Sequence, residues 1–249
     1  MRRFLPFAII TAVLLVAAGG GLFLFRSKNS NTPMKMALGN PGAEPAHIRG
    51  GANAVVTLEE FGDYECAPCG LLAATLLKVE HEYGNRVRVV FRQFPLDMHT
   101  YSLTAARAAE AAGLQGRFWE MHDLLYQNAL KWSKDSPVLP RRLIRNGARD
   151  ELAKAVRPTF AGYAATLGLD VDRFARDMDS EQVSARIKSD QERGASLGVD
   201  RTPVLLVDGV QIPFSTLKEP ELLNRVIEAA LKGSPPEIIP QSPTPAQPQ

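Results

Sequence analysis

The sequence has only two cysteines, Cys66 and Cys69, and they stand three positions apart. A structural disulfide framework cannot be proposed, because such frameworks need several cysteines spread along the chain. A strong charge of either sign is also absent, since 29 Lys and Arg against 27 Asp and Glu give a formal net charge of +2. No run of Lys and Arg is interleaved with aromatic residues, so we expect no nucleic-acid partner.

Neither end of the sequence has the composition of a packed domain. Residues 4–25 carry no charged side chain, and as a helix these 22 residues would span about 33 Å, which is enough to cross a bilayer. Two arginines precede this apolar run, and Arg26 and Lys28 follow it. Residues 1–28 are therefore predicted to be a membrane anchor.

A cleavable signal peptide is the alternative to a retained anchor. The small residues at 16–18 could serve a signal peptidase. The apolar stretch continues to Phe25, however, which favours a single-pass anchor. Basic residues flank both sides of the run, so the charge distribution by itself does not set the orientation of the chain in the membrane.

Two further segments are predicted to lie outside the folded domain. Residues 29–51 are rich in Asn, Pro and Gly with little apolar periodicity, and we expect a flexible linker there. Residues 233–249 contain six prolines and are expected to form a disordered tail. The remaining residues, 52–232, are numerous and apolar enough to form one domain with a sizeable core.

The first half of this domain predicts a βαβ unit. Residues 54–61 are few and rich in β-branched side chains, as in a strand. Apolar and aromatic side chains then recur at helical spacing, which predicts an amphipathic helix that begins at the cysteines and ends near Gly84. Residues 86–94 alternate Val and Phe with Arg, which is the pattern of a second strand.

The last part of the domain predicts a ββα unit. Residues 204–207 and 210–212 are short apolar runs on either side of Asp208-Gly209, the strongest short-range signal for a β-hairpin. Residues 218–232 predict a closing helix. Together the βαβ and ββα units predict an α/β fold with a helical insertion at about residues 100–197. The helical signals in the insertion are the Ala-rich stretch 100–112, the common face of Phe118, Met121, Leu125 and Ala129, and a run from about Asp172 into the 190s.

The two cysteines stand where the first strand gives way to the helix, so Cys66 is predicted at the helix N-terminus. Unpaired amides and the positive end of the helix dipole stabilise a thiolate there and lower the pKa of the thiol. Cys66 is therefore the predicted nucleophile. Two intervening residues let Cys69 come round one helical turn to resolve a mixed disulfide. Pro68 is compatible with this position, because a first-turn amide has no helical partner to lose.

Two other interpretations of the cysteine pair are weaker. Half of a zinc site would need two further ligands, whereas no second CxxC exists and the four histidines are scattered singly. Cysteines that merely pack as small apolar residues would rarely be flanked by acids such as Asp63 and Glu65. We expect no metal and no organic cofactor.

Residues 61–70, Phe-Gly-Asp-Tyr-Glu-Cys-Ala-Pro-Cys-Gly, resemble the active-site segment of DsbA-like oxidoreductases of the thioredoxin fold, in particular the bacterial branch with an N-terminal membrane anchor. The likeness covers most of residues 45–232 and includes Thr202-Pro203. It implies a thioredoxin-like fold with Cys66 and Cys69 as the catalytic pair. It also implies that Pro203 is cis and packs beside the pair, and that the backbone at Thr202 binds an extended substrate chain.

The resemblance implies thiol-disulfide exchange with exported cysteine-containing proteins. The favoured direction is disulfide donation, with a membrane redox partner that resets the pair. The expected location is the inner membrane, with the domain facing the periplasm or cell exterior. A reductase or isomerase would use the same cysteines, although residues 26–50 are too few for the dimerisation domain of such isomerases. The alternative that is not an enzyme is a membrane-tethered protein that binds peptides without turnover.

Four other residues bear on these alternatives. Pro68 stands where strongly oxidising relatives often carry His, so the direction of the reaction stays open. Arg201 replaces a Gly that often precedes the Thr-Pro pair, and we expect its side chain to point to solvent. His122 shares an apolar helical face and is expected to be packed, while His99 follows the second strand and is assigned no role.

Overall fold

The computed structural model describes residues 40–133 and 149–234. Within them, the helix after the cysteines ends at Tyr83, directly before Gly84 as predicted. The predicted βαβ unit is confirmed. Its elements and the strand before it are β1 (His47–Gly50), β2 (Val56–Gly62), α2 (Ala67–Tyr83), the 3-10 turn η1 (Gly84–Arg86) and β3 (Val87–Gln93).

The helical insertion and the ββα unit are also confirmed. The helices of the insertion are α3 (Ser102–Gly113), α4 (Phe118–Gln127), α5 (Ala129–Trp132), α7 (Arg149–Thr166), α8 (Val171–Asp177) and α9 (Glu181–Ser196). The chain then returns to the sheet. The closing elements are β4 (Val204–Val207), β5 (Val210–Gln211), α10 (Phe214–Leu217) and α11 (Pro220–Leu231).

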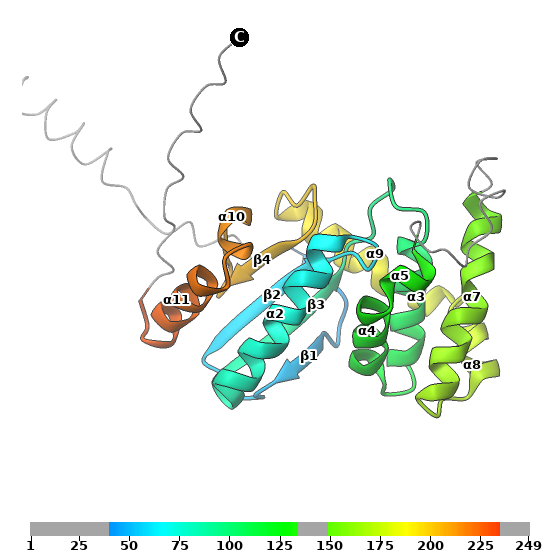
Figure 1. The fold of residues 1–249 in the computed structure, drawn as a ribbon, viewed down its shortest axis with the longest axis horizontal. Helices are drawn as coiled ribbons and strands as arrows, with labels where there is room; N and C mark the ends of the chain where they lie inside the picture. The colour runs from blue at the N-terminus through cyan, green and yellow to red at the C-terminus, as the bar shows by residue number, and fades with distance from the viewer. Residues whose placement is uncertain (1–39, 134–148, 235–249) are drawn as a thin grey trace, which may run out of the picture. The chain divides into compact units, whose positions relative to one another are not determined.

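The sheet has the strand order β1-β3-β2-β4-β5. Strands β2 and β3 are parallel, because α2 connects them as a crossover, and the other three pairs are antiparallel. The turn between β4 and β5 is formed by Asp208 and Gly209, which both have positive φ, 49° and 82°. This is the two-residue hairpin turn that the Asp-Gly pair predicts. Figure 1 shows α2 crossing the sheet in front of β2 and β3.

The predicted linker over residues 29–51 is wrong at its C-terminal end. His47–Gly50 form strand β1, which pairs antiparallel with β3 at the edge of the sheet. Four residues with no apolar alternation carry no strand signal of their own, and contacts with distant residues hold them. Arg49 is 2.8 Å from Glu80 on α2 and 2.9 Å from Asp123 on α4.

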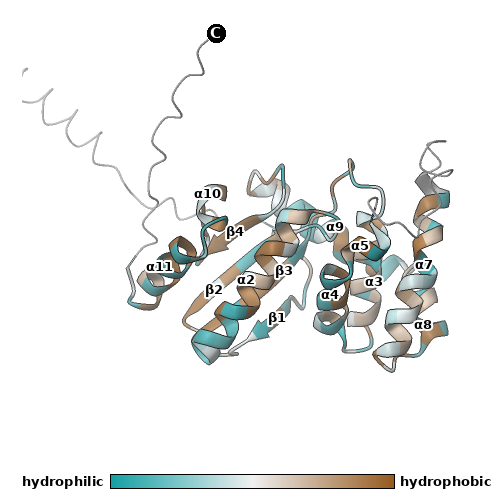
Figure 2. Ribbon diagram, in the orientation of Figure 1, coloured by the Kyte–Doolittle hydropathy of each residue, from teal (hydrophilic) through white to brown (hydrophobic). Residues whose placement is uncertain are grey.

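One apolar core lies between the sheet and the helices α2 and α11. Figure 2 shows β4 as strongly hydrophobic, whereas α11 alternates between hydrophobic and hydrophilic residues, as a helix with one buried face does. The opposite face of the sheet is covered near Phe61 by the end of α9 and the residues that follow it. The members of the first core include Leu58, Leu72, Leu76, Val89, Leu205, Leu223 and Ile227.

The insertion has a second core, and its last helical stretch differs from the prediction. Trp132, Phe160 and Phe174 are fully buried in it. The single helix expected from about Asp172 into the 190s is two helices, α8 and α9. They are separated because the Ser180 hydroxyl accepts a hydrogen bond from the amide of Val183 at 3.2 Å and so caps the start of α9.

The predicted anchor and nearly all of the predicted tail lie outside the described residues, as does the first part of the linker. Within the two described ranges, no helix is both long enough and apolar enough to cross a membrane.

Candidate active site

Cys66 and Cys69 lie at the junction between β2 and α2, as predicted. Cys66 has extended dihedral angles, φ −81° and ψ 110°, and immediately precedes α2. Its carbonyl accepts hydrogen bonds from the amides of Cys69 at 3.0 Å and Gly70 at 3.2 Å, which begin the helix. Cys69 is fully buried and Cys66 is 8% exposed, so Cys66 is the thiol of the pair that an incoming sulfur can reach.

The loop before β4 packs against the pair. The Thr202-Pro203 peptide bond is cis, as the resemblance implies, and Pro203 is buried. The Cys66 sulfur lies 3.6 Å from the carbonyl oxygen of Thr202. Antiparallel pairing of β2 with β4, with Phe61 opposite Val204, brings this loop from the far end of the insertion beside the first turn of α2.

The two thiols have opposite acidities. The hydrogen bond with the Cys69 thiol lowers the pKa of Cys66 to about 6, with help from Thr202 and the Cys69 amide and against the effects of burial and of Asp63. Burial raises the pKa of Cys69 well above its ordinary value, and its hydrogen bond with Cys66 and the nearby Glu60 add to this. Near neutral pH, Cys66 is therefore the thiolate and Cys69 the thiol, which is the state that disulfide exchange requires.

Two buried acids hold the loop after β3 against the redox segment. The Asp63 carboxylate accepts the amides of Glu65 and Leu96, each at 2.8 Å, and lies 2.8 Å from Nδ1 of His99. The Glu65 carboxylate accepts the amide of Tyr101 at 2.8 Å. The acids on either side of Tyr64 are therefore hydrogen-bonding anchors of the site.

Glu60 was not predicted from the sequence, and it is a candidate functional residue. Its side chain is fully buried, and neither carboxylate oxygen has a hydrogen-bond partner among the described residues. Burial raises the pKa of Glu60 to about 8, with Cys66 adding to the shift and Arg49 opposing it. The sequence contained a signal for the burial of Glu60. Alternate residues of a strand share one face, and Glu60 shares its face with Val56 and Leu58, which are both core residues.

An apolar groove of about 440 Å³ lies beside the pair. Pro68 and Pro203 line it, and so do Leu71 and Phe214, which are 74% and 40% exposed. Clustered exposed apolar side chains in a concave surface are typical of a binding site. The other lining residues are Leu72, Ala74, Thr75, Lys78, Leu217, Lys218 and Pro220.

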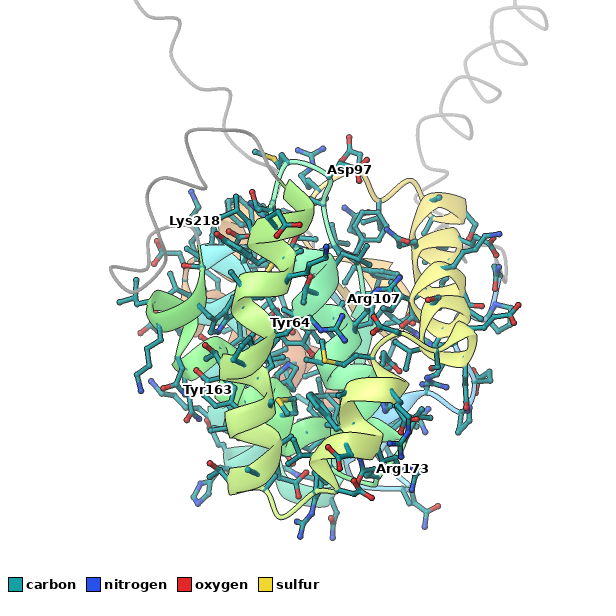
Figure 3. The ribbon with its side chains drawn as sticks, turned by 90° about the vertical axis from the view of Figure 1, so that its right-hand side faces the viewer. Tyr64, Asp97, Arg107, Tyr163, Arg173 and Lys218 are labelled. Atoms are coloured by element: carbon teal, nitrogen blue, oxygen red, sulfur yellow. The ribbon has the colours of Figure 1, made fainter. Side chains whose placement is uncertain are left out.

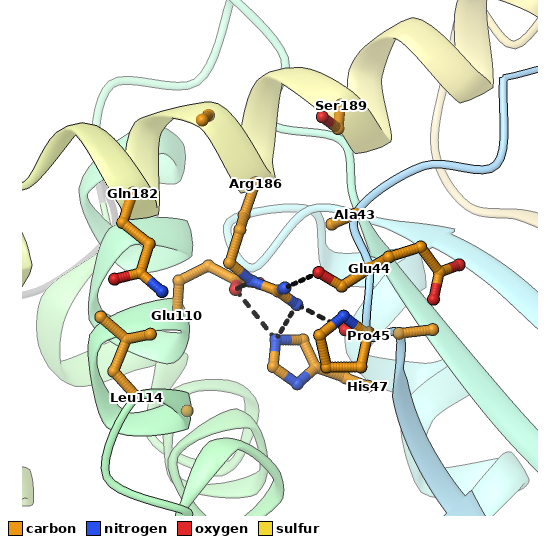
Figure 4. Close-up of a pocket in the computed structure, with 12 residues that line it drawn as sticks. Ala43, Glu44, Pro45, His47, Glu110, Leu114, Gln182, Arg186 and Ser189 are labelled. Atoms are coloured by element: carbon orange, nitrogen blue, oxygen red, sulfur yellow. Dashed lines mark hydrogen bonds and ion pairs between the residues drawn. The ribbon is translucent and has the colours of Figure 1, made fainter.

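A second cavity, of about 630 Å³, is lined by residues from α3, α9 and the segment that leads into β1. Figure 4 shows Arg186 at its centre. The guanidinium donates to Glu110 at 2.6 Å and to the carbonyl oxygens of Glu44 and Pro45 at 3.1 and 3.0 Å. Because the charge of Arg186 is matched within the chain, we interpret this cluster as a link between α9 and β1 and assign it no ligand.

Two of the remaining expectations are confirmed. His122 is almost completely buried and packs against aromatic rings that include Tyr64 and Phe91. Arg201 is exposed and pairs with its neighbour Asp200 at 2.9 Å. Among the described residues, no cluster of three or more His, Cys, Asp or Glu could hold a metal ion.

Comparison with curated proteins relates the chain to part of a larger protein. A Na(+)/H(+) antiporter, NhaA 1 of Mycolicibacterium gilvum, is 32% identical over 208 residues. The match covers 81% of this chain and 30% of the antiporter. The chain therefore spans less than a third of the length of this relative.

Three solved structures share the fold. A thioredoxin-like oxidoreductase from Silicibacter pomeroyi is 26% identical with a TM-score of 0.54, covering 74% of this chain and 93% of that one. BdbD from Bacillus subtilis is 21% identical with a TM-score of 0.59, covering 76% and 94%. The alpha-DsbA1 protein of Wolbachia pipientis is 19% identical with a TM-score of 0.56, covering 76% and 92%. A family model described as thioredoxin matches residues 42–229. The chain therefore belongs to the thioredoxin family and has the fold of its DsbA-like thiol-disulfide oxidoreductases.

Proposed function

We propose that this protein exchanges disulfides with exported cysteine-containing proteins. Cys66 forms the mixed disulfide; Cys69 is released when a disulfide is donated, and it attacks to resolve the mixed disulfide when the reaction runs in reverse. The opposite acidity of the two thiols carries this proposal. A partly accessible sulfur whose pKa is about 6 is a reactive thiolate at neutral pH. The buried sulfur beside it has a raised pKa and stays protonated until it is needed.

We propose disulfide donation as the direction of the reaction. A substrate thiolate attacks the Cys66 sulfur, so that a bond forms between the two sulfurs while the Cys66–Cys69 bond breaks and Cys69 leaves as a thiolate. A second substrate thiolate then attacks the substrate sulfur of the mixed disulfide and releases the Cys66 thiolate. The substrate loses two electrons and the pair gains them. A membrane redox partner that accepts two electrons resets the pair.

The acidity of Cys66 supports this direction. A stable Cys66 thiolate stabilises the reduced pair and makes the disulfide a stronger oxidant. The pKa of about 6 at Cys66 lies between the value of about 7 for thioredoxin and about 3.5 for DsbA. The reduction potential should therefore be less negative than the value of about −270 mV for thioredoxin.

Glu60 is suited to move the proton of Cys69. Because burial raises the pKa of Glu60 to about 8, its carboxyl group is mostly protonated at neutral pH. It can therefore give a proton to the Cys69 thiolate as that group leaves, and take one back in the reverse step. A buried acid without a hydrogen-bond partner is unfavourable for stability, so a role in proton transfer accounts for its presence.

We propose that substrate chains bind in extended form at Thr202 and Pro203. The 3.6 Å contact between Cys66 and the Thr202 carbonyl supports this, because a chain bound along that backbone would bring its cysteine to the reactive sulfur. The apolar groove continues from Pro203 to Phe214 and could hold the apolar side chains that unfolded proteins expose.

We further propose that residues 1–28 anchor the protein in the inner membrane as a single span, with the folded domain in the periplasm or cell exterior. The uncharged run at residues 4–25 supports the anchor. A cytoplasm-facing domain would instead meet a reducing thiol pool, in which a disulfide donor has no function.

The reduction potential of the pair in the full chain tests the proposal. Equilibration against glutathione buffers should give about −120 to −180 mV for a donor, whereas a value near or below about −270 mV would mean a reductant. Cys69→Ser should accumulate mixed disulfides with a peptide that contains a disulfide, because the Cys66 thiolate can attack that bond and release a peptide thiolate while no Cys69 thiol is present to resolve the product; Cys66→Ser should not. A wild-type protein that binds the peptide without any exchange would be a binding module instead of an enzyme.

A further inference from the structure

The apolar groove beside the redox pair is also lined by two lysines, Lys78 on α2 and Lys218 directly after α10. Both side chains are exposed, and Figure 3 shows Lys218 at the rim of the molecule. Every other residue that lines the groove is uncharged. Neither lysine forms an ion pair with any residue that the structure describes. The groove therefore carries positive charge that the described part of the chain does not neutralise.

Lys78 is the lining residue on α2 that lies farthest from the cysteines. Pro68, Leu71, Thr75 and Lys78 line the groove at spacings of three and four residues, so they share one face of the helix. Each helical residue rises about 1.5 Å, which places Lys78 about 15 Å along the helix from Pro68. An extended chain covers this distance with about four or five residues, at about 3.4 Å each. A substrate residue at that separation from the reacting cysteine would therefore lie beside Lys78.

Lys218 brings its charge to the same groove from a different element. Its ammonium nitrogen is 4.8 Å from the centre of the Phe214 ring, and that side chain is 40% exposed. A cation at this distance is attracted to the face of the ring. The charge of Lys218 is therefore held over an apolar side chain of the groove. An acidic substrate side chain that reached Phe214 would meet an apolar surface and a positive charge together.

We propose that Lys78 and Lys218 make the groove selective for substrate chains with an acidic residue about four or five positions from the reacting cysteine. This inference deepens the proposed function and rests on it. The groove continues from Pro203, which lies beside Cys66, so its occupant is the chain that carries the reacting sulfur. Apolar neighbours of the substrate cysteine contact the groove, and the acidic side chain pairs with the lysines. Opposite charges also speed the encounter of the two molecules.

Synthetic peptides with a single reduced cysteine test this selectivity on the oxidised full chain. The peptides are apolar around the cysteine and differ at one position, which is Asp, Gln or Lys. That position stands five residues before the cysteine in one set of three and five residues after it in a second set, since the direction of the bound chain is not assumed. The initial rate of mixed-disulfide formation is measured by acid quenching and mass spectrometry.

In at least one set the Asp peptide should react about twofold to tenfold faster than the Gln peptide, the size of one or two exposed charge pairs, and the Lys peptide should be the slowest. The advantage should shrink as the salt concentration rises from about 0.02 to 0.5 M, because exposed charges are screened. The double variant Lys78→Glu, Lys218→Glu should reverse the order of the Asp and Lys peptides. The matched control, Lys154→Glu with Lys188→Glu, makes the same change in net charge at exposed lysines outside the groove and should keep the wild-type order.

Equal rates for the Asp and Gln peptides in both sets would overturn the proposal, because the lysines would then serve only to keep an apolar surface soluble. A preference that the control variant reverses as fully as the groove variant would also refute it, since net charge would explain the effect. If no peptide is favoured but vesicles of anionic lipid slow the reaction, the lysines face a membrane surface and the proposal is wrong. If the wild type forms no mixed disulfide even with the Gln peptides, the proposed function itself fails, whereas reaction with the Gln peptides preserves that function whether or not selectivity is found.

Discussion

Replacing Glu60 with Gln should stabilise the reduced protein, and increasingly so as the pH rises. Burial raises the pKa of Glu60 from an ordinary 4.5 to about 8. Between these values the folded protein holds a proton that the unfolded chain has lost, so the free energy of unfolding falls by about 1.4 kcal/mol per pH unit. The wild type therefore loses about 3 kcal/mol between pH 4.5 and pH 7 and about 4 kcal/mol by pH 8, above which the loss levels off. A glutamine of nearly the same shape has no proton to lose.

Urea unfolding of wild type and Glu60→Gln, both kept reduced, measures this difference. The two proteins are compared at pH 4.5, 7 and 8.5. Burying the unpaired side-chain amide of the variant costs the same free energy at each pH, so it does not affect how the difference between the two proteins changes with pH. A difference that stays constant from pH 4.5 to 8.5 would refute the raised pKa and the proton-transfer role built on it. In exchange assays the oxidised form of the same variant should form the mixed disulfide with a reduced substrate more slowly, because the departing Cys69 thiolate then lacks its proton donor.

Three other substitutions should destabilise the protein by amounts that urea unfolding can measure. Gly62→Ala would place a Cβ 2.5 Å from the Phe91 ring and 3.0 Å from the Tyr126 hydroxyl, and should lower the free energy of unfolding by about 1–3 kcal/mol; an unchanged value would mean that both rings can move. Ser180→Ala removes the cap of α9 and should lower it by about 1 kcal/mol, whereas Ser180→Asp should keep it. Glu110→Gln leaves Arg186 without its buried partner and should lower it by about 3 kcal/mol, and a loss well below 1 kcal/mol would contradict the buried ion pair.

Local pattern in the sequence was sufficient to predict most elements and the cysteine pair. The spacing of Leu72, Leu76 and Val79 along one helical face predicted α2, and the Asp208-Gly209 pair predicted the hairpin, because both depend on interactions between residues close in the chain. For the same reason the position of Cys66 at the start of α2 could be predicted. Its low pKa follows in part from that position.

Residues whose conformation depends on distant partners could not be predicted in this way. Strand β1 has no apolar alternation and exists because β3, Glu80 and Asp123 hold it. The boundary between α8 and α9 was missed because one hydroxyl, that of Ser180, outweighs continuing helical propensity.

The sequence by itself thus determined the α/β architecture, the helical insertion and a reactive cysteine at a helix N-terminus. Only the tertiary structure decided what surrounds that cysteine. Thr202 comes to 3.6 Å from Cys66 through the pairing of β4 with β2. Glu60 acquires its raised pKa from complete burial, and His99 reaches Asp63 only because the loop after β3 folds back over the end of β2. Acidity and proton transfer at the site depend on such long-range burial and contact, which periodicity along the chain does not encode.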